Sequence, residues 1–434
     1  MASSAPTNIG TSAQESRSGR TSPVTIWRLI RKGRRQPTMT FRILLLLGAL
    51  SAFGPMAIDF YLPSFPAMAE AFATDVEHVQ LTLASYFVGL ALGQLVYGPL
   101  ADRFGRRPPL LVGVTIFTLA SVACALAPSL EWLIVARFIQ ALGGCAGMVV
   151  SRAVVRDLCD PIGSAKAFSQ LMLVMGLAPI LAPLGGGLLL GLFGWQSIFW
   201  GLTLFSVLVL LGVAFWLPET LSEVTPRAPL RGALGQYRRL FGDWQFLAYG
   251  MTGGLAMAGM FAYIAGSPFV FIQLYGVPAE HYGWLFGLNA AGFILVAQIN
   301  ALLVRRRGPA FWMRRFIWVY LLCALVLLLV SSLRTEALWP LMLPLFVCIA
   351  SLGCILPNAS ACAMAGQGQN AGSASALMGS LQFTVAAGAA ALVGALHDGS
   401  ALPLALVISL CGLGAVACAL LTWRLDHNGQ APLG

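Results

Sequence analysis

The chain has 434 residues, of which 58% are hydrophobic and only 10% charged, with a net charge of +10 and a mean hydropathy of +0.81. Soluble domains have about 45–50% apolar and about 25% charged residues, so this composition excludes an ordinary soluble enzyme, a disordered chain and a nucleic-acid binder. Because a spanning helix takes about 20 apolar residues, the sequence predicts a polytopic membrane protein with room for twelve spans.

Residues 1–41 are rich in Ser, Thr and Gly and carry a cluster of basic residues. We expect a disordered cytoplasmic tail whose charges fix the topology, and the second interpretation is that they bind anionic lipid. The first apolar run begins near Ile43 and continues through Tyr61 without a small-residue cleavage site. It therefore predicts a retained span and not a signal peptide.

Most connections between the apolar runs are very short, and the exception is a polar stretch over residues 218–244. It divides the chain into six spans plus six, a symmetry expected of transporters built from repeated halves. We expect an all-α integral membrane protein with one half at 42–217, a cytoplasmic linker at 218–244, a second half at 245–424 and a cytoplasmic tail at 425–434. The spans are expected near 43–66, 79–100, 109–128, 131–155, 167–190, 195–217, 245–273, 282–304, 311–333, 338–364, 371–396 and 401–424.

The positive charges predict the orientation of these spans. Twenty-four of the 26 Lys and Arg residues fall on one side if both termini are cytoplasmic, whereas Arg334 falls on the other side and Arg137 within a span. Cytoplasmic loops carry an excess of Lys and Arg. An odd number of spans or an inverted chain would remove this asymmetry.

Between the second and third spans, residues 98–108 read GPLADRFGRRP. Glycines permit close backbone approach and turning, and Asp102 can pair with an arginine or meet a helix N-terminus. This segment resembles the loop 2–3 signature of the major facilitator superfamily. The resemblance implies a cytoplasmic gate, and the alternative is a basic loop that only sets topology. The gate candidates are Gly98, Asp102, Arg103, Gly105 and Arg106.

The resemblance continues along the chain in six further segments. They are 59–63 (DFYLP), 137–144 (RFIQALGG), 178–187 (APILAPLGGG), 216–221 (WLPETL), 266–271 (GSPFVF) and 282–289 (YGWLFGLN). Together they resemble the bicyclomycin/chloramphenicol resistance (Bcr/CflA) family of drug:proton antiporters. The helix-5 antiporter motif is matched by Pro179, Pro183, Gly186 and Gly187, although Ala178 and Ala182 stand where the superfamily pattern has glycine.

Two ionisable residues, Asp59 and Arg137, lie clearly inside the expected spans. A charge at mid-bilayer costs about 3 kcal/mol or more, so such residues mark functional sites. At 1.5 Å per residue, Asp59 lies about 24 Å from the cytoplasmic face and Arg137 about 10 Å from the outer one, so their depths agree in a core about 30 Å thick. We expect a shared polar site, to which the resemblance assigns proton coupling. A structural ion pair, or Asp59 opening to periplasmic water, is the alternative.

Neutral polar and aromatic side chains are candidates for lining a substrate cavity. For each polar residue, hydrogen bonding between helices is the competing interpretation, and each aromatic residue could instead pack or face lipid. The substrate-binding candidates are Tyr61, Gln140, Phe261, Tyr263, Asn289, Asn358 and Gln382.

Several chemistries have no motif in this chain. There is no P-loop, Gly-x-Ser-x-Gly elbow or HExxH, and the nine scattered cysteines and four histidines predict neither a metal site nor disulfides. We therefore expect no enzyme activity and no cofactor other than the proton. A membrane-embedded transferase would need clustered acidic or histidine ligands, and a non-transporting receptor is a further alternative.

The resemblance implies proton-coupled efflux of small drugs by alternating access across the bacterial inner membrane. The nearest rival on the same fold is a uniporter or symporter of a metabolite. A monomer is expected, because the fold needs no partner to satisfy its polar backbone.

Overall fold

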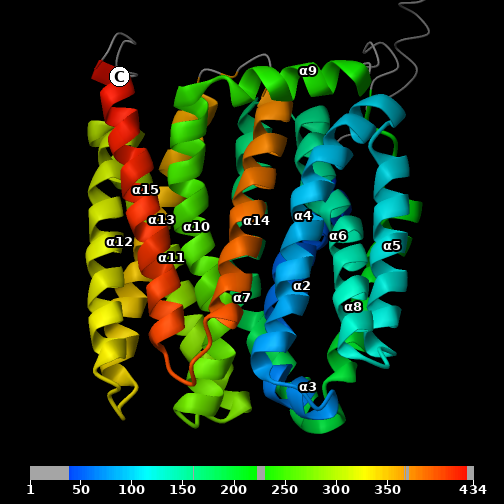
Figure 1. Cartoon of the computed structure of the whole chain (residues 1–434). Helices are drawn as coiled ribbons and strands as arrows, with labels where there is room; N and C mark the ends of the chain where they lie inside the picture. Colours follow the sequence, from blue (N-terminus) through cyan, green and yellow to red (C-terminus); the bar gives the residue numbers. More distant parts are fainter. Residues whose placement is uncertain (1–38, 160, 222–229, 366, 368–370, 428–434) are drawn as a thin grey trace, which may run out of the picture. The chain divides into compact units, whose positions relative to one another are not determined.

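The computed structural model describes residues 39–159, 161–221, 230–365, 367 and 371–427, which belong to one compact unit beginning at Met39. Within these residues every regular element is a helix, which confirms the all-α prediction (Figure 1). Most of the expected tail at 1–41, the end of the expected tail at 425–434 and residues 222–229 of the expected linker lie outside the described residues.

The first half of the bundle contains six long helices and two short ones near the end of the first. They are α2 (Phe41–Asp59), a 3-10 turn (Leu62–Ser64), α3 (Phe65–Ala71), α4 (Val76–Phe104), α5 (Arg107–Ala125), α6 (Leu130–Leu158), α7 (Pro161–Phe193) and α8 (Gln196–Trp216). The second half follows a surface helix, α9 (Leu230–Phe241), which lies across one end of the bundle in Figure 1. It comprises α10 (Trp244–Pro268), a π-helical turn (Phe269–Leu274), α11 (Ala279–Arg307), α12 (Pro309–Ser332), α13 (Trp339–Met364), α14 (Ala371–Ala395) and α15 (Leu402–His427).

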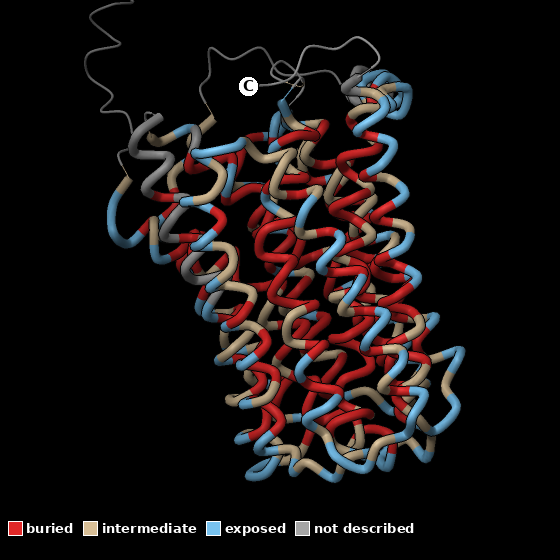
Figure 2. Tube along the Cα trace, turned by 90° about the vertical axis from the view of Figure 1, so that its left-hand side faces the viewer, coloured by how far each residue is buried: buried red, intermediate tan, exposed pale blue. Residues whose placement is uncertain are grey.

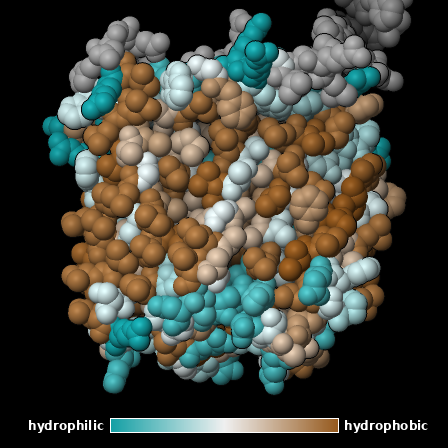
Figure 3. Space-filling view, in the orientation of Figure 1, coloured by the Kyte–Doolittle hydropathy of each residue, from teal (hydrophilic) through white to brown (hydrophobic). Residues whose placement is uncertain are grey.

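The long helices match the expected spans. Among the described residues, eleven helices are long and apolar enough to cross a membrane, and α7 adds a shorter apolar segment at Leu177–Phe193. Figure 3 shows an apolar band across the molecule, with hydrophilic residues gathered toward its two ends. We call the end that carries α9 the α9 end, and the end that carries α3 the α3 end.

Local polar groups define where several helices begin. The Ser129 hydroxyl accepts from the Trp132 amide at 3.3 Å at the start of α6, and the Asp243 carboxylate accepts from the Phe246 amide at 3.0 Å at the start of α10. Such side chains satisfy amides that have no partner within the helix. The α6 cap therefore fixes the depth at which Arg137 enters the bundle two turns later.

The two halves meet along two pairs of helices. α4 packs along α14, and α7 packs along α11. Buried residues line the inner sides of the helices, as Figure 2 shows. An aromatic cluster of Phe87, Phe261 and Phe383 joins α4, α10 and α14, with the Phe87 and Phe261 ring centroids 4.3 Å apart.

Three boundaries differ from the expectation. α4 continues to Phe104, so Gly98 to Phe104 lie on its last two turns and not in a loop. α2 ends at Asp59, where a 3-10 turn containing Pro63 interrupts the first span. The linker contains helix α9, whose apolar and basic residues alternate in a way that suits a helix lying at a surface.

Candidate functional site

Asp59 is the last residue of α2 and is buried near the α3 end of the bundle. Its Oδ1 atom has no hydrogen-bond partner among the described residues. Buried polar atoms in folded proteins are almost always hydrogen-bonded, so an exception calls for an explanation. A carboxylate without a partner inside an apolar bundle is a candidate for a functional site.

Arg137 is fully buried on α6, beside α2. Its Nη2 donates to the Ala57 carbonyl at 2.8 Å, and its Nη1 donates to Gln140 Oε1 at 2.5 Å. The guanidinium also lies 4.3 Å from the ring centroid of Tyr61 and 4.2 Å from that of Tyr86. Its positive charge is therefore stabilised by a carbonyl, an amide and two aromatic faces.

Asp59 and Arg137 lie near one another along α2, since Arg137 bonds the carbonyl two residues before Asp59. No ion pair within 4.0 Å joins them among the described residues, so the sequence alternative of a structural ion pair does not describe this conformation. The 3-10 turn that begins three residues after Asp59 instead packs against α7 and against α10 and α11. α10 and α11 belong to the second half, so Asp59 lies beside the contact between the halves.

The second half places hydroxyl and amide groups on α10 and α11, the two helices of that half that the turn after Asp59 contacts. Asn289 Nδ2 donates to the Tyr263 hydroxyl at 3.1 Å, and the Tyr282 hydroxyl lies 2.7 Å from Ser267 Oγ. The Tyr263 ring stacks on Phe286 at 5.5 Å between centroids. Both tyrosines are buried in this conformation, and side chains of this type can donate hydrogen bonds and stack on apolar ligands.

The helix-5 motif lies against this site. Pro179 and Pro183 are inside α7, and the Gly186 position faces the Phe60 carbonyl so closely that a Cβ would overlap it. A Cβ on Gly187 would lie 3.2 Å from the Ala279 carbonyl at the start of α11. The motif thus allows α7 to approach the residue after Asp59 and the opposite half at once.

The other substrate candidates do not form one group. Tyr61 and Gln140 belong to the surroundings of Arg137. Phe261 belongs to the aromatic cluster, and Gln382 lies against Gly254 of α10. Asn358 donates to Asn300 Oδ1 at 2.8 Å, which joins α13 to α11 and fits the helix-packing interpretation.

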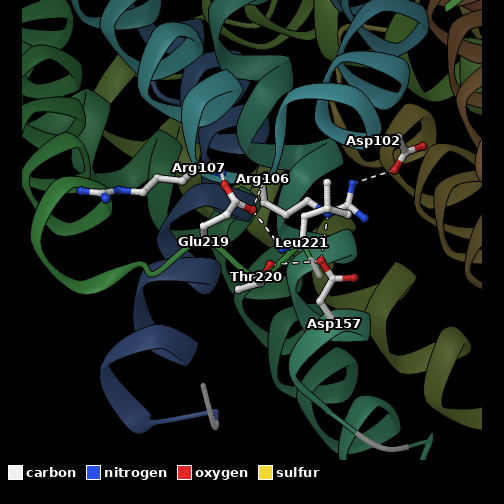
Figure 4. A network of polar contacts seen from close by, with 7 residues as sticks. All are labelled: Asp102, Arg106, Arg107, Asp157, Glu219, Thr220 and Leu221. Atoms are coloured by element: carbon white, nitrogen blue, oxygen red, sulfur yellow. Dashed lines mark hydrogen bonds and ion pairs between the residues drawn. The ribbon is translucent and has the colours of Figure 1, made fainter. Parts of the chain in front are cut away.

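A network of charged residues lies at the α9 end of the first half, with Arg106 at its centre (Figure 4). Arg106 Nη1 donates to Asp102 Oδ1 at 2.6 Å, and its Nε donates to Asp157 Oδ2 at 2.9 Å. The Glu219 carboxylate accepts from the Arg106 amide at 2.8 Å and from the Arg107 amide at 3.1 Å. The network joins the ends of α4 and α6, the start of α5 and the segment after α8.

Arg106 is largely buried in this network. Burial by itself would lower its pKa, but hydrogen bonds and attraction to Asp157 and Asp102 outweigh burial and raise the pKa above its ordinary value. Arg106 therefore keeps its charge at every physiological pH.

Three of the five gate candidates, Asp102, Gly105 and Arg106, belong to the network. Gly98 makes no close approach, because no described atom lies within 4 Å of the position a Cβ would take. Arg103 is exposed and stacks on Phe104 at 5.4 Å. Both lie outside the network in this conformation.

Sequence reasoning missed Asp157 and Tyr86, and it gave Glu219 no role. Asp157 follows Arg152 and Arg156 near the end of α6, and no sequence pattern there predicts a contact with Arg106. Tyr86 looked like any aromatic residue of an apolar span. The contacts of all three residues are with segments distant in the chain.

Gly105→Ala is expected to destabilise the network, because Gly105 has φ +98° and the Glu219 carboxylate occupies the space of a Cβ. Backbone strain of this kind costs about 1–3 kcal/mol. Thermal unfolding of the purified protein in detergent should show a lower midpoint for this variant. Gly98→Ala is the control and should leave the midpoint unchanged or raise it; equal midpoints for the two variants would contradict the assignment.

At the α3 end, a contact between two polar side chains connects the two halves. His397 Nε2 lies 3.0 Å from Glu77 Oε1, and both side chains are partly buried. Glu77 is in the first turn of α4, and His397 follows α14. The imidazole also packs edge-on against Phe269 at 4.4 Å.

Comparison with known proteins gives consistent matches. The family model of the Major Facilitator Superfamily matches residues 44–391. The chain is 36% identical to the uncharacterized MFS-type transporter YdgK of Bacillus subtilis, over 84% of this chain and 90% of that protein. It is 32% identical to the bicyclomycin resistance protein homolog of Haemophilus influenzae, over 87% and 94%, and 32% identical to multidrug resistance protein D of Escherichia coli, over 89% and 98%.

Solved structures share the fold at low sequence identity. The xylose transporter XylE from E. coli, in a partially occluded inward open conformation, matches with a TM-score of 0.68 at 13% identity, over 90% of this chain and 99% of that chain. A bacterial homolog of the human lysosomal transporter Spinster matches with a TM-score of 0.66 at 15% identity, over 90% and 98%.

Proposed function

The chain belongs to the major facilitator superfamily and is a multi-pass membrane transporter, not an enzyme, and we propose that it exports small drugs or antibiotics in exchange for protons. Full-length relatives above 30% identity are named as bicyclomycin or multidrug resistance proteins. The observation that carries the proposal is the buried Asp59 carboxylate, whose Oδ1 atom has no described hydrogen-bond partner, beside the contact between the two halves.

In this proposal the two halves rock about the Asp59 region and expose it to each side of the membrane in turn. Asp59 takes up a proton from the outside and releases it inside, and drug binding replaces the proton. Arg137 takes no part in the proton exchange in this proposal, and its partners are a carbonyl, an amide and aromatic rings. The positive charge beside α2 is proposed to favour release of the proton on the inside, before drug binds.

The Arg106 network is proposed to stabilise one arrangement of the α9 end. Its bonds join three helices and the segment after α8, all within one half, so they hold that half together as a unit. Rocking of the halves then occurs at the α4–α14 and α7–α11 contacts. At the α3 end, the Glu77–His397 pair must separate whenever the site opens to that side.

The proposed orientation places the α9 end in the cytoplasm of a bacterium and the α3 end outside its inner membrane, following the excess of Lys and Arg at one side. Reporter fusions at Arg107 and Arg239 should give cytoplasmic signals, and fusions at Gly194 and Pro278 periplasmic ones. A periplasmic signal at Arg239 would contradict this topology.

Export is tested by drug accumulation in cells with and without the gene. Cells that make the protein should accumulate less fluorescent dye and resist higher doses of some compounds in a panel of bicyclomycin, phenicols and sulfonamides. A metabolite uniporter or symporter, the alternative on the same fold, would leave dye levels unchanged or raise uptake of its own substrate. If export is proton-driven, dissipation of the proton gradient should remove the difference in dye accumulation between cells with and without the protein.

A further inference from the structure

Four exposed arginines gather where α11 ends and α12 begins, at the α9 end of the bundle. We call this region the α11–α12 corner; it consists of Arg305, Arg306, Arg307, Phe311 and Arg315. The described residues form no ion pair within 4.0 Å with any of these arginines. The sequence has no Asp or Glu between Glu280 and Glu336, so no nearby acidic residue can neutralise the corner from its own helices.

The corner is held in a defined geometry. The guanidinium of Arg307 lies 5.0 Å from the Phe311 ring centroid, and that of Arg315 lies 5.4 Å from the same centroid. The Gly308 amide donates to the Val304 carbonyl at 2.9 Å, and Trp312 Nε1 donates to the Leu303 carbonyl at 2.8 Å. Two like charges are thus fixed beside one ring, and an anion between them would relieve their repulsion.

The surface below the corner is apolar on both helices. On α11, Leu295, Ile299 and Leu302 are exposed and precede Arg306 at helical spacing on one face. On α12, Trp318 and Leu322 are exposed and follow Arg315 on one face. On each helix, an arginine therefore lies at the end of a stripe formed by these exposed apolar residues. This arrangement is expected at the boundary between acyl chains and headgroups.

We propose that the α11–α12 corner binds the phosphate headgroup of an anionic phospholipid, whose acyl chains lie along the apolar stripes. A guanidinium presents its donors in a planar fork that matches phosphate oxygens. The neighbouring apolar stripes favour a lipid over a soluble phosphate, because they supply contact area for acyl chains. Bound lipid then neutralises a cluster that no described side chain neutralises.

The α9 helix offers a matched control for this proposal. Arg238 and Arg239 are also exposed, adjacent basic residues at the same end of the molecule. They have no cation–π partner among the described contacts. Removing this pair therefore removes the same charge without touching the corner.

The experiment measures phosphatidylglycerol binding to the purified full-length protein in detergent micelles by native mass spectrometry. Each basic residue near an anionic surface contributes about 1 kcal/mol, so Arg307→Gln with Arg315→Gln should weaken binding about 30-fold. Arg238→Gln with Arg239→Gln should retain most of the wild-type affinity. Phosphatidylcholine should bind weakly to all three proteins, and inorganic phosphate should not displace phosphatidylglycerol.

Equal losses in the two double variants would overturn the proposal, because they would reduce the effect to net charge. Displacement of the lipid by inorganic phosphate would overturn it too, in favour of a soluble anion. If the corner variant does not fold, the salt dependence of phosphatidylglycerol binding to the wild-type protein still tests the proposal. Raising ionic strength from about 0.1 M to about 1 M shortens the screening length from about 10 Å to about 3 Å, so binding must fall steeply, and salt-independent binding would contradict a headgroup site.

Discussion

Asp59→Asn is expected to abolish drug transport against a concentration gradient, together with drug-induced proton release, while some drug binding survives. Asn has nearly the shape of Asp but cannot take up and release a proton. One proton crossing 100 mV supplies about 2.3 kcal/mol, and 1.4 kcal/mol corresponds to a tenfold gradient. Without a carboxylate that takes up and releases a proton, proton movement can no longer drive the drug against its concentration gradient.

The decisive assay uses proteoliposomes with an imposed pH gradient and a fluorescent substrate. Glu131→Gln is the matched control, because Glu131 is an exposed carboxylate in the first turn of α6 at the same end of the bundle. The control should transport like wild type. If the Asp59 variant still accumulates substrate against its gradient, the coupling carboxylate lies elsewhere.

Arg106→Gln is expected to lower both transport and stability. The change leaves the carboxylates of Asp102 and Asp157 without their shared partner. Hydrogen bonds to charged groups contribute about 1.5–3 kcal/mol each, so the unfolding midpoint should fall and efflux should drop by at least tenfold.

Asp102→Asn removes one exposed partner of Arg106 only, so we expect crippled transport with near-normal protein levels.

Arg103→Gln is the control for both variants, because Arg103 carries the same charge three residues earlier and lies outside the network. Its efflux rate and unfolding midpoint should match those of wild type. Efflux at the wild-type rate in the Arg106 variant would refute a role of the network in the transport cycle. A loss of the same size in the Arg103 variant would show that only the total loop charge matters.

The sequence predicts the helices well, because a run of apolar residues long enough to cross a bilayer has few other stable forms. The expected spans match the long helices to within a few residues at most ends. The sequence does not predict the break of the first span after Asp59, because the expected span runs through Pro63 to residue 66. The extension of α4 to Phe104 was missed because Gly98 and Pro99 favour a turn in water.

Contacts between distant segments were harder to predict. The depth of Asp59 and Arg137 follows from counting residues along two helices, but the angle of each helix about its own axis does not. That angle directs Arg137 toward Tyr61, Tyr86 and the Ala57 carbonyl. For the same reason, Asp157 could not be joined to Arg106, which lies 51 positions earlier in the chain.

The way in which Arg137 is held has a consequence for how such a protein can change over evolution. Because its described partners are a carbonyl, an amide and aromatic rings, the arginine does not depend on an acidic residue to remain in the bundle. Mutations that moved the carboxylate by a helical turn, or to a facing helix, would leave the described hydrogen bonds of Arg137 in place. The hydrogen bonds and ring contacts of Arg137 therefore place no requirement of their own on where in the bundle the acidic residue stands.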